Sequence, residues 1–167
     1  TFGIEPLPAH AAHARDIFAA SVVTDTLRQD TFASRSFDVI TAFQVFEHLP
    51  DPRENLLNLH AALKVGGVIH IEVPNIDTWG VRLLGRHHRH FVQDHLTFFS
   101  PMTLQELLRS CAFRIIEVGH PARKMTVRHL VTVWMARYLP AAVIRLLEAV
   151  CLRLSLWERI LSLNLGD

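Results

Sequence analysis

Residues Phe37 to Pro52 read FDVITAFQVFEHLPDP, and this stretch is the most informative part of the chain. Its first part, Phe37–Phe43, is almost entirely apolar or β-branched, which is typical of a strand buried on both faces of a parallel sheet. Polar side chains follow at Gln44, Glu47 and His48. Ligands of open α/β sheets bind beyond the carboxyl ends of the strands. The stretch therefore predicts a strand that leads into one wall of a ligand site, with an ordinary polar loop as the simpler alternative.

Strand and helix signals alternate on both sides of this stretch. Strands are expected at residues 1–5, 21–24, 68–73 and 113–118, and helices at residues 10–20, 52–64 and 101–111. Such alternation implies right-handed βαβ units. The expected fold class is α/β, with a Rossmann-like, mainly parallel sheet and helices on both faces.

The helix after the central strand has clear start and stop signals. Asp51 suits the cap, Pro52 suits the first helical position, and Glu54 completes a capping box. Gly66 and Gly67 are expected to end the helix.

Residues 76–99 are expected to form one long loop, and loops of this length are usually functional or mobile. This loop contains Arg86-His87-His88-Arg89-His90 and His95. We interpret the Arg86–His90 cluster as a basic, mobile loop that attracts an anionic substrate. A metal site there is the less favoured alternative, because adjacent side chains point in many directions.

The composition excludes several classes of function. The 17 basic residues nearly balance the 16 acidic ones, so no basic field indicates nucleic-acid binding. Cys111 and Cys151 lie in apolar helical patterns, which favours buried thiols and a cytoplasmic location. The sequence contains no uncharged apolar run of about 18 residues, so a membrane-spanning helix is not expected.

Several motifs, in this order and spacing, resemble class I S-adenosylmethionine-dependent methyltransferases, in particular the bacterial small-molecule branch. They are Glu5-Pro6, Asp25, FDVITAFQVFEHLPDP, Lys64-Val65-Gly66-Gly67, Val73-Pro74-Asn75, and HLTFFSPMTLQELL followed by Phe113-Arg114-Ile115-Ile116. The resemblance covers residues 1–119. It implies a partial methyltransferase core over residues 1–120, with a helical lid or interfacial segment over residues 121–167.

The resemblance implies S-adenosylmethionine as cofactor and assigns residues to it. Glu5, followed by Pro6, would hold the ribose hydroxyls, since a carboxylate accepts two hydrogen bonds from a vicinal diol. Asp25, with Thr26 beside it, would contact the adenine, although a turn-forming Asp is an equal alternative. The end of the central strand would line the cofactor through Ala42, Phe43 and Gln44.

An oxygen nucleophile often needs a base, and imidazole changes protonation near neutral pH. His48 and His95 are therefore the candidate catalytic residues. The simpler alternatives are a structural loop histidine for His48 and a loop anchor for His95. Glu47 and His48 alone are a weak signal for a divalent cation, so no metal is assigned.

Two elements of the family are expected to be missing from the printed chain. The glycine-rich loop, which approaches the methionine end of the cofactor, would precede Thr1. The last strand would follow Gly166-Asp167. We therefore expect the first and last strands to be absent, and the chain by itself to be poorly soluble, inactive and unable to bind S-adenosylmethionine.

The leading interpretation is methyl transfer from S-adenosylmethionine to a small molecule, of a lipid-linked or sugar type among others. A non-catalytic binding or scaffold domain on the same fold is the alternative. A short-chain dehydrogenase is disfavoured, because Tyr138, the only tyrosine, lies in the late helices. Those leucine-rich helices, split by Pro140 and interspersed with arginines, suit a lid, a dimer interface or peripheral membrane contact.

Overall fold

The computed structural model describes residues 1–120 and 123–163, which divide into two compact units. The first unit comprises residues 1–74 and 90–116, and the second comprises residues 75–89 and the described part of 117–167. The predicted boundary at residue 120 stays a prediction, and Gly166-Asp167 lies outside the described residues.

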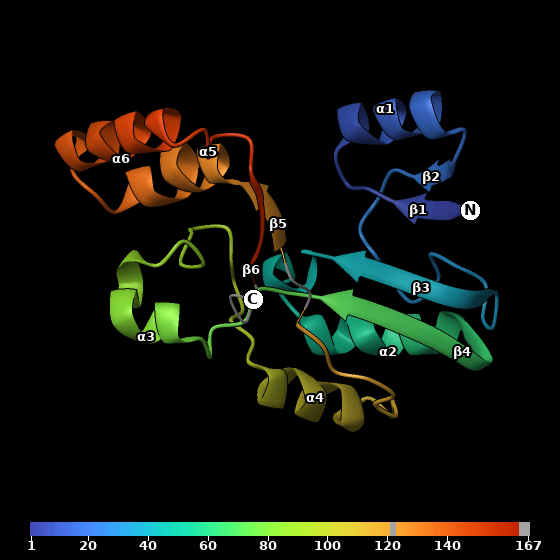
Figure 1. The fold of residues 1–167 in the computed structure, drawn as a ribbon. Coiled ribbons are helices and arrows are strands. Elements are labelled where there is room, and N and C mark those ends of the chain that lie inside the picture. Colours follow the sequence, from blue (N-terminus) through green and yellow to red (C-terminus); the bar gives the residue numbers. More distant parts are fainter. Residues whose placement is uncertain (121–122, 164–167) are drawn as a thin grey trace. The chain divides into compact units, whose positions relative to one another are not determined.

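Two pairs of parallel strands form the sheet structure of the first unit (Figure 1). β1 (Phe2–Ile4) pairs with β2 (Ser21–Val23), and α1 (Pro8–Phe18) connects them. β3 (Phe37–Phe43) pairs with β4 (Leu63–Glu72), and α2 (Pro52–Ala62) connects them. Each pair is a βαβ unit, so the predicted Rossmann-like α/β class is confirmed.

One face of the β3–β4 pair carries the core of this unit. Helices α2 and α4 (Pro101–Ser110) supply the apolar side chains that pack against it. The buried members are Ala42, Phe46, Leu56, Leu59, Phe99 and Cys111. The apolar stripe predicted for residues 101–111 is therefore confirmed, and Cys111 is a buried free thiol as expected.

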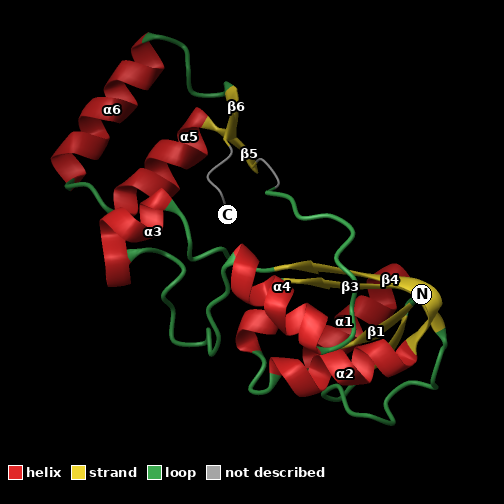
Figure 2. Ribbon diagram, turned by 90° about the horizontal axis from the view of Figure 1, so that it is seen from below, coloured by secondary structure: helices red, strands yellow, loops and turns green. Residues whose placement is uncertain are grey.

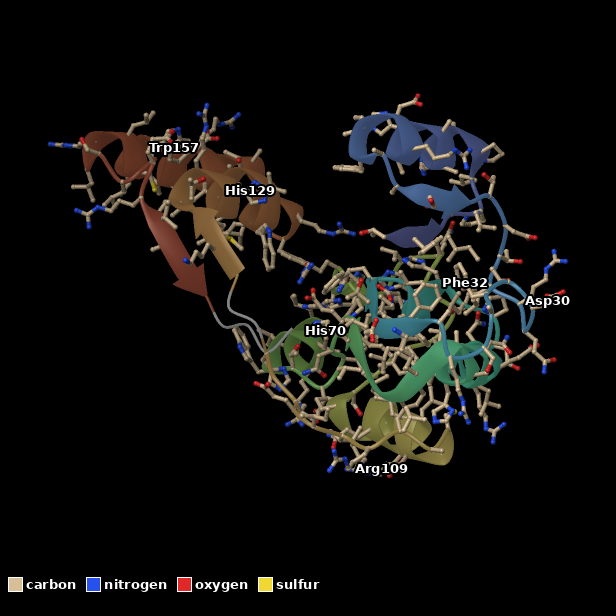
Figure 3. All side chains as sticks on the ribbon, turned by 90° about the vertical axis from the view of Figure 1, so that its right-hand side faces the viewer. Asp30, Phe32, His70, Arg109, His129 and Trp157 are labelled. Carbon is tan, nitrogen blue, oxygen red and sulfur yellow. The ribbon has the colours of Figure 1, made fainter. Side chains whose placement is uncertain are left out.

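The opposite face of the β3–β4 pair is exposed. Val39 and Phe43 are 60% and 54% accessible to solvent. His70, labelled in Figure 3, lies on this face with its ring centroid 5.1 Å from that of Phe43. The predicted burial of β3 on both faces is wrong for the described residues, because the helices that pack there cover one face.

The start of α2 agrees with the sequence, but its end does not. The Asp51 carboxylate accepts a hydrogen bond from the Glu54 backbone N–H at 2.9 Å. The side chain that donates to the Asp51 carbonyl is the amide of Asn55, at 2.7 Å, and not Glu54. The helix ends at Ala62, and β4 already begins at Leu63. Residues 63–67 form a bulge opposite the start of β3, which explains why two glycines lie inside a strand.

The strand predicted at residues 113–118 is wrong. These residues have no regular secondary structure. A strand exists only through its ladder of hydrogen bonds with a neighbour. No strand among the described residues pairs with this segment.

The second unit holds most of what the sequence did not predict. The expected loop at 76–99 contains α3 (Trp79–Leu84), capped by Thr78, and the short helix η2 (Gly85–His87). Two antiparallel strands, β5 (Arg123–Thr126) and β6 (Ile160–Leu163), were also missed.

Helices lie between these two strands along the chain (Figure 2). They are α5 (Val127–His129), the π-helical η3 (Leu130–Trp134), η4 (Met135–Arg137) and α6 (Ala141–Arg153). The predicted division at Pro140 is confirmed, since α6 begins directly after it. Their core includes Val131, Ile144 and the buried free thiol of Cys151. None of the described helices is long and apolar enough to cross a membrane.

Candidate functional site

The turn after β3 presents a glutamate and a histidine side by side. This turn is the 3-10 helix η1 (Phe46–His48). Phe46 is buried in the core beneath it, and this anchor fixes the direction of the two residues that follow. The Glu47 side chain points inward and its residue is 1% exposed, while His48 is partly exposed.

A second segment, residues 90–99, is hydrogen-bonded to this turn. The backbone N–H groups of Leu96 and Thr97 both donate to the Glu47 carbonyl oxygen, at 2.7 and 3.1 Å. The His48 Nδ1 atom lies 2.8 Å from the Asp94 carbonyl oxygen. These bonds hold the segment against η1, so it is fixed rather than freely mobile at this point.

The structure brings the two predicted catalytic histidines together. The ring centroids of His48 and His95 are 4.8 Å apart, in an edge-to-face arrangement. The His48 Nε2 atom lies 3.9 Å from Oε1 of Glu47. We refer to Glu47, His48 and His95 as the histidine–glutamate cluster.

The end of β3 is conformationally unusual. Gln44 has a positive φ of 54°, which is uncommon for any residue other than glycine and is often found at functional sites. Its backbone N–H donates to the Glu72 carbonyl at 2.8 Å, and its side-chain amide donates to the Glu72 carboxylate at 3.2 Å. Neighbouring Phe43 is exposed and Ala42 is buried in the core.

The predicted ribose and adenine ligands lie at the ends of β1 and β2. The Glu5 backbone N–H donates to the Val23 carbonyl at 3.0 Å, which places the two strand ends side by side. The Glu5 side chain is about one-third exposed. Its Oε1 atom accepts a hydrogen bond from the Leu7 N–H at 2.9 Å, across Pro6. This geometry leaves the carboxylate accessible to a ligand.

Asp25 forms a local turn. Its Oδ1 atom accepts a hydrogen bond from the Thr26 N–H at 2.7 Å and lies 3.2 Å from the Arg28 guanidinium. These are the contacts of a turn-forming Asp, and the adenine contact of Asp25 stays a prediction. No hydrogen bond or ion pair joins Glu5 or Asp25 to the histidine–glutamate cluster within the described part of the chain.

The Arg86–His90 cluster, predicted to be a basic, mobile loop, is partly buried, and its mobility stays a prediction. Arg86 and His87 are exposed, whereas His88 and His90 are buried. The Arg89 guanidinium lies 4.3 Å above the Trp134 ring, and the Arg89 N–H donates to the Tyr138 hydroxyl at 3.1 Å. The last three members, His88, Arg89 and His90, are thus buried or packed, and the exposed part of the cluster is Arg86 and His87.

Two residues of the site were missed from sequence. Glu72 is the last residue of β4, which pairs with β3. Ligands bind beyond the carboxyl ends of such strands, and this rule, used for Gln44, could have identified Glu72 as well. Asp94 contributes through its backbone carbonyl, and a backbone contact leaves no signal in residue type.

The comparisons with known proteins agree with this fold. Residues 1–118 match a family described as "Methyltransferase domain", so the chain belongs to that family, and the resemblance stated above is confirmed. Among curated proteins, none matches the chain closely enough to count as a relative.

Several solved structures share the fold. An S-adenosylmethionine-dependent methyltransferase of Thermotoga maritima is 23% identical over 68% of this chain, with a TM-score of 0.59. One from Archaeoglobus fulgidus is 19% identical over 95% of this chain and 72% of its own length, with a TM-score of 0.58. The chain spans 55% of the length of the Thermotoga protein. At these identities the likeness establishes the fold.

Proposed function

We propose that this protein transfers a methyl group from S-adenosylmethionine to a small-molecule acceptor. The observation that carries the proposal is the match of residues 1–118 to the methyltransferase domain family. The accessible carboxylate at the end of β1 supports it, because acids at this position of Rossmann-like sheets bind ribose hydroxyls.

The cofactor supplies an activated methyl group on a sulfonium. The protein's own residues therefore mainly bind, orient and exclude water. In our proposal Glu5 accepts hydrogen bonds from the ribose diol, and Asp25 and Thr26 contact the adenine. Pro6, Ala42, Phe43 and Gln44 line the cofactor.

Either histidine of the cluster can act as the base for an oxygen acceptor. The Asp94 carbonyl next to His48 Nδ1 only accepts hydrogen bonds, so Nδ1 carries the ring proton. In the neutral ring, Nε2 then has the lone pair that removes the acceptor's proton as the new carbon–oxygen bond forms.

The experiment incubates the whole protein with S-adenosylmethionine labelled in its methyl group and a panel of small hydroxylated acceptors. We expect labelled product and S-adenosylhomocysteine in equal amounts, detected by mass spectrometry. Cofactor binding without turnover on any acceptor would favour the non-catalytic alternative. Absence of cofactor binding would overturn the proposal.

A further inference from the structure

The Glu47 carboxylate is buried, and within the described residues it makes no hydrogen bond and a long 3.9 Å contact with Nε2 of His48. Both of its oxygens are inaccessible, and neither has a hydrogen-bond partner among the described residues. Taking an ionised carboxylate out of water is costly unless hydrogen bonds, an opposite charge or a metal ion compensates it. The position of Glu47 is fixed by η1 and by the neighbouring Phe46, which is buried in the core.

His48 is oriented as a metal-binding histidine usually is. Metal-ligating imidazoles commonly donate their second ring N–H to a backbone carbonyl or a carboxylate, which fixes the tautomer. The Asp94 carbonyl, 2.8 Å from Nδ1, has this role for His48. The lone pair of the neutral ring is then on Nε2, the atom that lies 3.9 Å from Glu47 Oε1.

His95 supplies a third nitrogen donor. Its Nδ1 atom is buried and has no hydrogen-bond partner in the part of the chain that the structure describes. Glu47, His48 and His95 each offer one ligand atom, and these atoms all lie within 4.8 Å of one another. Zinc ligands lie about 2.0–2.2 Å from the ion, so small side-chain rotations are enough to bring the three atoms onto one centre.

We propose that the histidine–glutamate cluster binds one divalent transition-metal ion. Two imidazole nitrogens and one carboxylate oxygen suit Zn²⁺ or Co²⁺ better than Mg²⁺ or Ca²⁺, which prefer oxygen ligands throughout. Three protein ligands leave a further coordination position open to water or to an oxygen of a bound molecule. This assignment replaces the sequence-based interpretation that no metal is held.

The inference concerns the same site as the proposed function but does not depend on methyl transfer. A metal ion would use the lone pairs that base catalysis needs, so the two roles exclude each other for a given histidine. Metal binding is measured without cofactor or acceptor, so a failure here leaves the proposed methyl transfer standing.

The test titrates ZnCl₂ into the whole, chelator-treated protein by calorimetry, and CoCl₂ while the visible absorption is recorded. We expect one equivalent of either ion to bind. Co²⁺ should give the intense visible bands of a low-coordinate nitrogen–oxygen site. Glu47→Gln and His95→Ala each alter or remove a proposed ligand. Each should weaken zinc binding at least as much as loss of a residue that hydrogen-bonds to a ligand, which costs roughly 10- to 100-fold.

Matched controls separate this site from other histidines. His13→Ala removes an exposed imidazole on α1, and His87→Ala removes one from the Arg86–His90 cluster. Both variants should bind zinc with unchanged affinity. Because Glu47→Gln keeps the side-chain shape, it should fold, and circular dichroism checks this.

A thermal melt gives an independent measurement. Zinc should raise the Tm of the wild-type protein and of both controls, but not that of Glu47→Gln. Zinc binding of wild-type affinity in Glu47→Gln, zinc binding lost in His87→Ala, or no binding of one equivalent by the wild-type protein would overturn the proposal.

Discussion

His95 belongs to the candidate site but does not lie on a strand that we propose to contact the cofactor. It lies in the segment 90–99, which is hydrogen-bonded to η1, and its ring faces that of His48. In the proposed function, His95 acts on the methyl acceptor and not on the cofactor. We therefore expect separate effects on turnover and on cofactor affinity.

His95→Ala should lower kcat by about 100-fold or more, because it removes either the proposed base or a ligand of the metal ion that would replace that base. The Kd for S-adenosylmethionine should change by less than about twofold. Steady-state kinetics and calorimetry measure the two quantities, with His13→Ala as a control that changes neither. If both parameters fall together, or if neither changes, His95 is a structural loop residue.

At the scale of the element, α4 connects the functional segment to the core. The Ser100 hydroxyl accepts a hydrogen bond from the Thr103 N–H at 3.2 Å, and the Thr103 hydroxyl accepts one from the Ser100 N–H at 2.9 Å. This reciprocal capping box satisfies N–H groups that the first helical turn leaves free. It also fixes the point at which the segment 90–99 enters the helix.

Ser100→Ala should reduce the free energy of unfolding by about 1 kcal/mol, the usual cost of losing a cap. Ser110→Ala in the same helix is the control, because that hydroxyl caps no helix start: it donates to the Leu107 carbonyl of its own helix and lies 3.8 Å from the Cys111 sulfur. Urea denaturation of the three proteins gives the comparison. Equal midpoints for Ser100→Ala and the wild-type protein would show that the cap does not stabilise α4.

Helix α6 combines exposed leucines with arginines. Leu146 and Leu152 are 65% and 61% accessible, and Arg145 and Arg153 are also exposed. We propose that this basic, apolar surface contacts anionic membranes, as amphipathic helices of this kind do. A lid over the substrate pocket and a dimer interface are the alternatives.

The whole protein should float with vesicles that contain anionic lipid and not with neutral vesicles. Leu146→Asp should abolish flotation, since it places a charge in the apolar surface. Liposome flotation in a density gradient measures this. Wild-type protein that stays at the bottom of the gradient with anionic vesicles would reject the membrane role and favour the alternatives.

At the scale of the whole molecule, the strands of the first unit have free edges. Within the described residues β1 pairs only with β2, and β3 only with β4. In addition, the apolar side chains of Val39 and Phe43 on β3 are exposed to solvent. Unpaired edges beside exposed apolar side chains favour intermolecular association.

The 167-residue chain expressed by itself should therefore self-associate. Size-exclusion chromatography with light scattering should show oligomers or aggregates whose size grows with concentration. A monodisperse monomer would show that the free edges are protected in solution.

The sequence predicted correctly those elements that depend on local residue type and spacing. The strand Phe37–Phe43, the Asp51 cap and the apolar stripe of α4 follow from residue type and spacing. The strand expected at 113–118 failed because pairing depends on a neighbour, which residue type does not report. The β5–β6 pair was missed for the same reason, since its two strands are far apart in sequence.

The candidate site was partly predictable. His48 and His95 were named from their residue type, but their contact depends on hydrogen bonds that N–H groups of a distant loop donate to the Glu47 carbonyl. The burial of Glu47 depends on Phe46 and on the packing around η1. Neither fact is visible in the sequence alone.

Binding of S-adenosylmethionine by the whole protein tests the central claim most directly, and Glu5 is the residue on which it depends. Isothermal titration calorimetry should show one saturable site for the wild-type protein. Glu5→Ala should weaken binding by roughly 10- to 100-fold, because a hydrogen bond to a charged group contributes about 1.5–3 kcal/mol. Asp16→Ala, which removes an exposed acid from α1, should bind like the wild-type protein. Unchanged affinity in Glu5→Ala would remove Glu5 from the site, and the absence of any saturable binding by the wild-type protein would contradict the assignment of a methyltransferase.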